Sequence, residues 1–254
     1  MKKIFAICNL LALIATIVIN YLSNTGVFNG NTMKTVSDKY FNYFTPAGYA
    51  FSIWGLIYLL LICFVVYTGR VLFNKTADET LSKIGWWFVL SCLGNSLWVV
   101  AWLYDYTGLS VLIMLVMLVA LVKIVTNISV QTASLKHYVF VYLPFAIYLG
   151  WISVALVACV SAYLTKINWA GFGISKIDWA IVMVLIAGLI NILMISCKNI
   201  KEFGMVGIWA LIAIGVSNTQ ERAPIAFVYL CYLVAGILAL AIIIGFFKRK
   251  RVDI

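Results

Sequence analysis

Charged residues are scarce in this chain, and that scarcity limits what kind of protein it can be. Asp, Glu, Lys and Arg make up 10% of the 254 residues, against about 25% in an ordinary soluble domain. Hydrophobic residues make up 65%, and the mean hydropathy is +1.09. A soluble protein of this length could not bury so much apolar surface in one core. The composition therefore excludes a soluble enzyme, a disordered chain, a collagen and a small disulfide scaffold.

The residues that usually carry chemistry are also missing or scattered. His137 is the only histidine, and the six cysteines lie in apolar segments without any C-x-x-C pair, which is typical of small core residues rather than metal ligands. All eight acidic residues fall in loops, at span ends or in the C-terminal tail, so no intramembrane carboxylate relay is indicated. No catalytic triad, phosphate-binding glycine loop or H-E-x-x-H motif is present. We therefore predict no catalytic residue, no metal and no required cofactor.

Long apolar runs are the dominant positive feature. A helix needs about 20 residues to cross a hydrocarbon core of roughly 30 Å. The runs of suitable length are residues 4–22, 47–69, 83–104, 107–130, 138–164, 178–197, 203–218 and 224–247. They predict an all-α polytopic membrane bundle of about eight transmembrane helices, in which the seventh run is the shortest and could be a tilted or partly re-entrant helix. The first run follows Lys2 and Lys3 like a secretory signal, but no small-x-small cleavage site closes it, which favours a retained helix.

The positive charges predict the orientation of these spans. If the N-terminus is cytoplasmic, thirteen of the 18 Lys and Arg residues fall inside, including the basic tail at 248–251. Only five lie in outside loops: Lys34, Lys39, Lys166, Lys176 and Arg222. This bias favours an even number of spans with both termini in the cytoplasm, as in a bacterial-type plasma membrane. It also accounts for the net charge of +10 without nucleic-acid binding.

Aromatic residues and one amide gather in the predicted outer half of the membrane, below a long external loop at 23–46. Trp98 and Trp102 share one helical face, with Asn95 one turn away on the same face,. Trp54 and Trp151 lie at similar depth in their own spans. A buried amide needs hydrogen-bond partners, so Asn95 should face the bundle interior. Such a cluster fits a flat, mostly apolar ligand, although the same pattern also suits plain helix packing.

Three segments that carry these residues resemble the TspO/translocator-protein family, the tryptophan-rich sensory proteins. Residues 46–58 read PAGYAFSIWGLIY, similar to the family pattern P-P-G-W-x-F-x-x-W-x-x-L-Y, with Ala47 in place of the second proline. Residues 95–98 read NSLW, like the family's N-x-x-W, and residues 148–155 read YLGWISVA, like Y-L-x-W-x-x-x-A. The order of these motifs and the long first loop also agree with the family.

The resemblance implies a five-helix membrane domain at 1–165, followed by a three-helix extension at 166–254 that the five-helix members lack. Family members bind porphyrins, sterols and synthetic aromatic ligands under the first loop. By resemblance, Trp54, Asn95 and Trp151 match the family's pocket positions. The full set of expected ligand-binding residues is Trp54, Asn95, Trp151, Tyr58, Trp98, Trp102, Pro46 and Tyr148.

The function expected from this resemblance is a membrane sensor or binding protein for a planar hydrophobic ligand such as a porphyrin or haem-like tetrapyrrole. The alternative is a transporter for a hydrophobic small molecule, for which eight spans would supply a path. The third interpretation, and the only enzymatic one, is light-dependent porphyrin breakdown. The fourth is a structural protein with a solid core. The expected partners are the lipid bilayer, the small hydrophobic ligand and a second copy in a homodimer.

Overall fold

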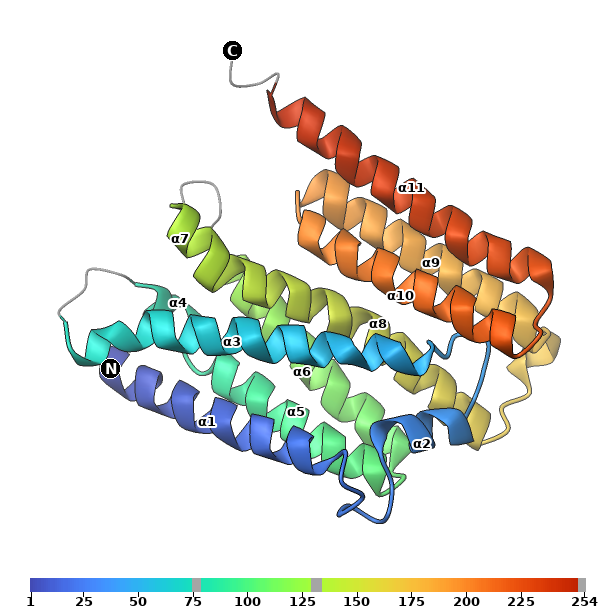
Figure 1. Cartoon of the computed structure of the whole chain (residues 1–254), viewed down its shortest axis with the longest axis horizontal. Coiled ribbons are helices and arrows are strands. Elements are labelled where there is room, and N and C mark those ends of the chain that lie inside the picture. The colour runs from blue at the N-terminus through green and yellow to red at the C-terminus, as the bar shows by residue number, and fades with distance from the viewer. Residues whose placement is uncertain (75–78, 129–133, 251–254) are drawn as a thin grey trace. The chain divides into compact units, whose positions relative to one another are not determined.

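The computed structural model describes residues 1–74, 79–128 and 134–250, and every regular element within them is helical (Figure 1). The predicted all-α bundle is therefore confirmed. The last two residues of the predicted span 107–130, and Arg251 of the basic tail, lie outside the described residues.

The chain forms long helices joined by short helical turns. The long helices are α1 (Lys2–Leu22), α3 (Ile53–Gly69), α5 (Trp87–Leu103), α6 (Thr107–Asn127), α8 (Leu143–Lys166), α9 (Lys176–Cys197), α10 (Lys201–Gln220) and α11 (Ile225–Lys250). The short α-helices are α2 (Met33–Lys39), α4 (Thr80–Ile84) and α7 (Leu135–His137). The remaining turns are η1 (Gly48–Ser52), η2 (Arg70–Leu72), η4 (Gly171–Gly173) and the π-helical η3 (Tyr138–Tyr142).

Seven helical segments of the described chain are long and apolar enough to cross a membrane. The third predicted span is the exception, because its helix α5 has only 17 residues, or about 25 Å of rise. We predicted that this span begins at residue 83, but the helix begins at Trp87. Gly85 interrupts it with a φ of +54°, a conformation that a helix cannot contain. The shortest predicted run, 203–218, lies within the continuous 20-residue helix α10.

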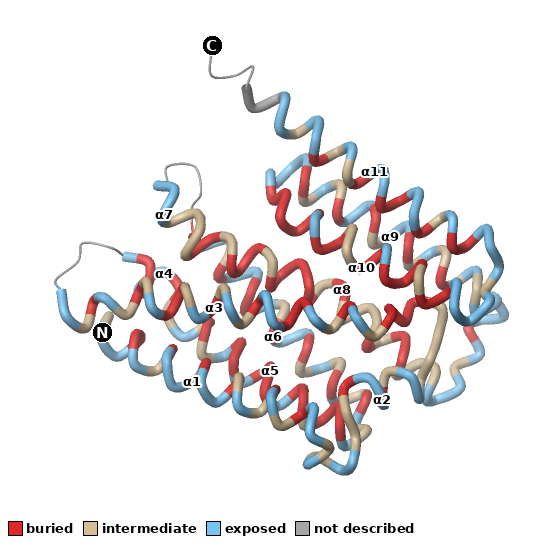
Figure 2. Tube along the Cα trace, in the orientation of Figure 1, coloured by how far each residue is buried: buried red, intermediate tan, exposed pale blue. Residues whose placement is uncertain are grey.

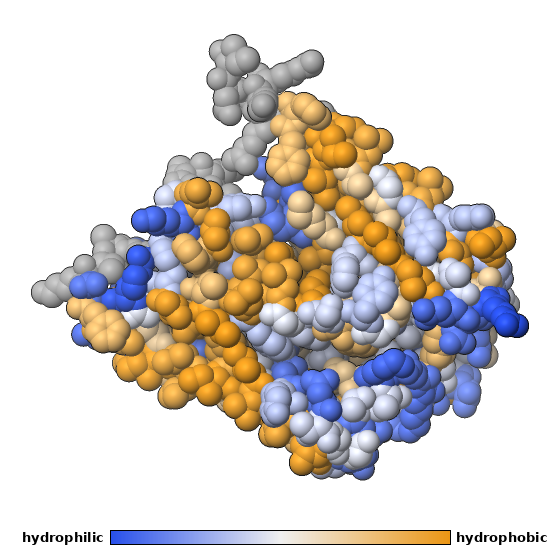
Figure 3. All heavy atoms as spheres, viewed as in Figure 1, coloured by the Kyte–Doolittle hydropathy of each residue, from blue (hydrophilic) through white to orange (hydrophobic). Residues whose placement is uncertain are grey.

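The surface of α1 shows why this fold requires a lipid environment. Its buried stripe includes three polar residues, Asn9, Thr16 and Asn20. Its exposed surface is mainly apolar instead, and includes Ile4, Ile7, Leu11, Ile14 and Val18. A helix of a soluble protein shows the opposite arrangement. Exposed and buried residues alternate along α1 in Figure 2, and orange apolar side chains cover it in Figure 3.

The chain divides into two compact units, which are described separately. Unit 1 consists of Met1–Val36 and Ile53–Ile152, and unit 2 of Ser37–Ser52 and Ser153–Ile254. The division falls inside α8 and assigns the second half of the first loop to unit 2. The domain boundary at 165/166 comes from the family resemblance and stays a prediction.

In unit 1, α5 packs against α6 through a small residue. A Cβ on Gly94 would lie 2.6 Å from Cγ of the fully buried Met117, so the two backbones approach more closely than any larger residue would allow. The same helix presents Asn95 and Trp98 to the interior of the unit. This close approach therefore helps to position the candidate site.

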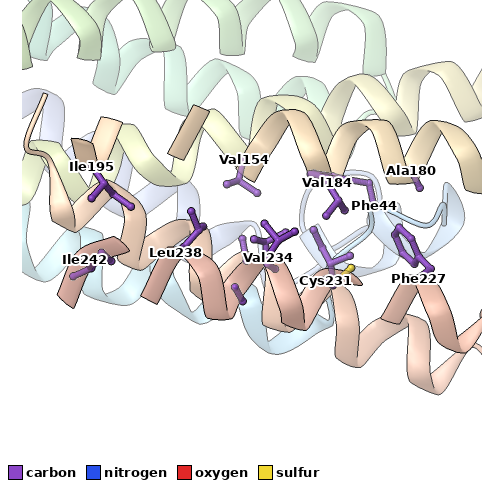
Figure 4. Packing of buried hydrophobic residues seen from close by; sticks show 14 residues of the cluster. Phe44, Val154, Ala180, Val184, Ile195, Phe227, Cys231, Val234, Leu238 and Ile242 are labelled. Carbon is purple, nitrogen blue, oxygen red and sulfur yellow. The ribbon is translucent and has the colours of Figure 1, made fainter. Parts of the chain in front are cut away.

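In unit 2, the segment 41–50 is fixed against α10 by hydrogen bonds to its backbone. The Ala47 amide donates to the Ala213 carbonyl at 3.0 Å. The Asn218 side chain donates to the Tyr43 carbonyl at 2.8 Å, and the Trp209 indole donates to the Ala50 carbonyl at 3.3 Å. Phe44 inserts its ring among apolar residues of α9 and α11 (Figure 4). The second half of the predicted external loop is therefore an integral part of the packing of this unit.

Close packing of α9 on α10 generates the first prediction. A Cβ on Gly207 would overlap the side-chain amide of Asn191, whereas a Cβ on Gly236 of α11 meets nothing within 4 Å. Gly207→Val should lower the apparent melting temperature of the detergent-purified protein by about 2–10 °C, the effect of an overpacking cost of about 1–3 kcal/mol. Gly236→Val is the matched control and should leave it within about 1 °C. Equal melting temperatures for the two variants would contradict this packing.

Candidate functional site

The amide of Asn95 is the centre of a hydrogen-bond network inside unit 1. Asn95 is 0% exposed. Its Oδ1 accepts hydrogen bonds from Asn20 Nδ2 of α1 at 2.7 Å and from the Tyr58 hydroxyl of α3 at 3.4 Å. Its Nδ2 donates to the Tyr148 hydroxyl of α8 at 3.3 Å. One side chain thus links α5 to three other helices, and the structure shows the interior, hydrogen-bonded position predicted for it.

A second row of polar side chains extends the network along α1. The other Asn20 amide hydrogen is donated to the Thr16 carbonyl at 3.0 Å. The Thr16 hydroxyl lies 2.9 Å from the Ala12 carbonyl, 3.0 Å from the Cys92 carbonyl and 3.2 Å from Ser96 Oγ. These contacts compensate for burying polar groups in an apolar bundle, and they fix the register of α1 on α5.

Aromatic rings surround Trp54, one turn before Tyr58 on α3. The centroid of the Trp54 ring lies 5.6 Å from Tyr58, 6.0 Å from Trp98, 5.9 Å from Tyr148 and 6.3 Å from Trp151. The Tyr58 ring is stacked on it, while Tyr148 and Trp151 meet it edge-on. Such distances are typical of rings in direct contact. Trp54 is therefore the hub of a continuous aromatic cluster.

Two of the three indoles of α5, those of Trp98 and Trp102, differ in their hydrogen bonding. Trp102 is stacked on Trp98 at 6.3 Å and donates its Nε1–H to the Met33 carbonyl at 3.4 Å. Trp98 is 4% exposed, and its Nε1–H has no acceptor among the described residues. A buried donor without an acceptor costs about 1–3 kcal/mol. Trp98 therefore keeps an unused donor directed into an apolar cluster.

The first half of the long loop covers this end of α5. In addition to the Trp102–Met33 bond, Asn31 Nδ2 donates to the Leu103 carbonyl at 2.9 Å. The second half belongs to unit 2 and includes the buried Pro46. Seven of the eight expected binding residues are thus brought together in unit 1, and Pro46 is not placed with them. Their role in binding a ligand stays a prediction.

Asn20 and Thr16 belong to this network, although the sequence analysis did not single them out. The signal that could have identified both residues is their spacing with Asn9: three polar residues recur on one face of an otherwise apolar helix, and polar residues in a transmembrane helix usually face the protein interior.

The chemistry that this cluster offers is binding rather than group transfer. Its members supply ring faces, indole and phenol donors and one amide, without carboxylate or imidazole groups. Among the described residues, no group of three His, Cys, Asp or Glu side chains could hold a metal ion. The arrangement can stack on a flat ligand and donate hydrogen bonds to a few acceptors on it.

The Asn95 network generates the second prediction. In Asn95→Leu, Asn20 Nδ2 and the two tyrosine hydroxyls lose their shared partner, and each buried polar group left unpaired costs about 1–3 kcal/mol. We expect the apparent melting temperature to fall by about 5–10 °C. Asn127→Leu removes an exposed amide and is the matched control, with little expected change. A fall no larger than in the control would show that Asn95 does not hold these helices together.

The comparisons with known proteins agree with the motifs and extend them. A family model described as TSPO-like protein matches residues 6–244. The match continues through the three C-terminal helices, beyond the 1–165 region to which the resemblance was assigned. No similar curated protein and no similar solved structure was found. Together with the seven apolar helices of membrane-spanning length, the match shows that the chain is an integral membrane protein that belongs to the TSPO-like family.

Proposed function

We propose that this protein is a membrane sensor that binds a planar hydrophobic ligand, such as a porphyrin or haem-like tetrapyrrole, in the aromatic cluster of unit 1. Membership of the TSPO-like family supports a ligand-binding or sensory role in general. The observation that carries the specific proposal is the buried Nε1–H of Trp98, which has no acceptor among the described residues. A ligand with an acceptor atom on a substituent that reaches out of its ring plane would satisfy this donor.

A flat ligand would have to part rings that are now in contact. The centroids of Trp54 and Trp98 are 6.0 Å apart, with an angle of 34° between their planes. A planar ligand between the two rings would have to separate them by about its own thickness, about 3.5–4 Å. Binding at this position therefore requires the aromatic cluster to open.

The same geometry offers a route from binding to signalling. Trp98 is stacked on Trp102, and Trp102 is hydrogen-bonded to the carbonyl of Met33 in the first loop. A ligand that moves Trp98 would alter this stacking. It would thereby also alter the Trp102–Met33 hydrogen bond to the loop. Such coupling requires an interaction that differs between the ligand-free and the ligand-bound state. We expect this interaction to be the Trp102–Met33 hydrogen bond, because at 3.4 Å it is weak.

The binding test uses the ligand's own spectrum, so that removing a tryptophan does not alter the signal. Detergent-purified protein is titrated in the dark with protoporphyrin and with hemin, and the Soret absorbance is recorded. We expect saturable binding that weakens about tenfold in Trp98→Phe. This change keeps an aromatic ring at the position but removes the indole N–H donor. Trp86→Phe is the matched control, because Trp86 is 55% exposed and packs against Phe5.

Binding that is absent, or equal in the two variants, would contradict the proposal. Flux of the bound porphyrin across proteoliposomes, abolished by Trp98→Phe, would favour the transporter. Loss of the Soret band only under illumination would favour light-dependent breakdown. A sensor should bind the porphyrin without transporting it and without light-dependent loss of the Soret band.

We further propose that both termini lie in the cytoplasm of a bacterial-type cell, supported by the bias of Lys and Arg between alternate loops,. An epitope tag added after Ile254 should resist protease in intact spheroplasts and be digested after lysis. Digestion in intact spheroplasts would reverse the orientation. Association into a homodimer stays a prediction.

A further inference from the structure

Unit 2 contains a pocket that the proposed function does not use. Its volume is about 700 Å³, within the range of about 300–1,000 Å³ that is typical of small-molecule sites. It lies where α8 ends, α9 begins and the connection from α10 to α11 passes, and the segment 41–44 forms one wall. All the residues that line it belong to unit 2.

The wall formed by the loop segment is held in place by hydrogen bonds. The side-chain Oδ1 of Asn42 accepts a hydrogen bond from the backbone N–H of Phe44 at 3.0 Å. The backbone N–H of Asn42 donates to Thr45 Oγ1 at 3.0 Å. The Tyr43 carbonyl accepts from Asn218 of α10, and the Tyr43 ring meets Phe227 of α11 edge-on. The pocket is therefore largely formed before any ligand arrives.

The opposite wall is an aromatic turn between α8 and α9. Trp179 donates its Nε1–H to the Gly171 carbonyl at 2.8 Å, and its ring lies 5.3 Å from that of Trp169. Gly171 has a φ of +67°, and a Cβ there would lie 3.2 Å from the Trp179 ring, so glycine is required at this close approach.

The part of the pocket around Met183 is mainly apolar, with the Ser161 hydroxyl 3.3 Å from the Met183 sulfur. Met183 is seven residues beyond the first residue of α9, or about 10 Å along the helix. Phe44 and Ala180 are buried beside it in the apolar core of the unit. A guest that reaches Met183 would thus have its far end at the depth where headgroups give way to acyl chains.

The rim carries the charges. Lys176, Glu221 and Arg222 line the pocket, and all three are exposed. The rim thus has one positive charge in excess. Neither Lys176 nor Arg222 forms an ion pair with another described residue. A cationic rim over an apolar interior is complementary to an anionic head joined to an apolar body.

We propose that this pocket binds a single-chain amphiphile with an anionic head, a fatty carboxylate or an alkyl phosphate. Lys176 and Arg222 bind the head, and the chain passes Leu164 toward Met183. This site is separate from the aromatic cluster of unit 1, and its ligand is chemically distinct from the planar one.

The test is photolabelling of the full-length protein in phosphatidylcholine nanodiscs with a diazirine-bearing palmitate, followed by peptide mass spectrometry. We expect label in peptides that contain residues 161–183 and 221–224. Excess palmitate or hexadecyl phosphate should compete, whereas uncharged hexadecanol should not. Palmitate competing without hexadecyl phosphate would restrict the head to a carboxylate, and the reverse would restrict it to a phosphate.

Two kinds of variant separate this site from general lipid contact. Lys176→Gln with Arg222→Gln should lower the labelling about tenfold, because the charge-assisted contacts to the head are lost. Lys123→Gln with Lys198→Gln removes the same charge from positions that do not line the pocket and should leave the labelling unchanged. Thr165→Trp should block the pocket sterically, while Trp98→Phe should have no effect.

Label spread evenly over lipid-facing peptides would overturn the proposal. So would equal competition by hexadecanol, or equal loss of label in the two double variants. The melting temperature of each variant, measured beside the labelling, distinguishes loss of the site from loss of the fold. Failure of porphyrin binding in unit 1 would leave these results unaffected.

Discussion

The amide of Asn95 is buried in an apolar bundle. It needs hydrogen-bond partners from the protein itself, because the apolar surroundings supply none. Its partners come from three helices, through Asn20, Tyr58 and Tyr148. This requirement fixes the rotation of α1, α3 and α8 about their axes. The same rotations bring Trp54 and its neighbouring rings into contact. The aromatic cluster is therefore a geometric consequence of satisfying one amide, and Trp98, unlike Trp102 on the same helix, keeps an unused donor.

In unit 2, the groups that need hydrogen-bond partners are backbone amides and carbonyls. The segment 41–50 lacks the internal hydrogen bonds of a long helix, so its carbonyls and amides need other partners. Asn218, Trp209 and the Ala213 carbonyl supply them from α10. The small residues Gly204 and Gly207 let α10 approach α9 closely. A loop fixed in this way can form one wall of a pocket. The C-terminal helices thus do more than add spans, because they order the segment that leads into α3.

The sequence predicted the helical fold and most of the candidate site because apolar runs and motif spacing are local signals. Helical periodicity placed Asn95, Trp98 and Trp102 on one face, and the family resemblance singled out Trp54. The break at Gly85 was missed because a single positive φ leaves little trace in hydropathy. Asn20 was missed because its partner is 75 residues away. The pocket of unit 2 could not be predicted, because it depends on tertiary contacts between the loop and α8, α9 and α10.

The central claim is that the indole N–H of Trp98 is reserved for a ligand. The most direct measurement is an NMR spectrum of protein labelled with ¹⁵N in its nine tryptophan indoles, with the Trp98 cross-peak assigned by its absence in Trp98→Phe. Addition of protoporphyrin should shift the Trp98 indole proton resonance, through the new hydrogen bond and the porphyrin ring current together, and leave that of Trp86 in place. A Trp98 resonance that does not move at saturating porphyrin would contradict the account.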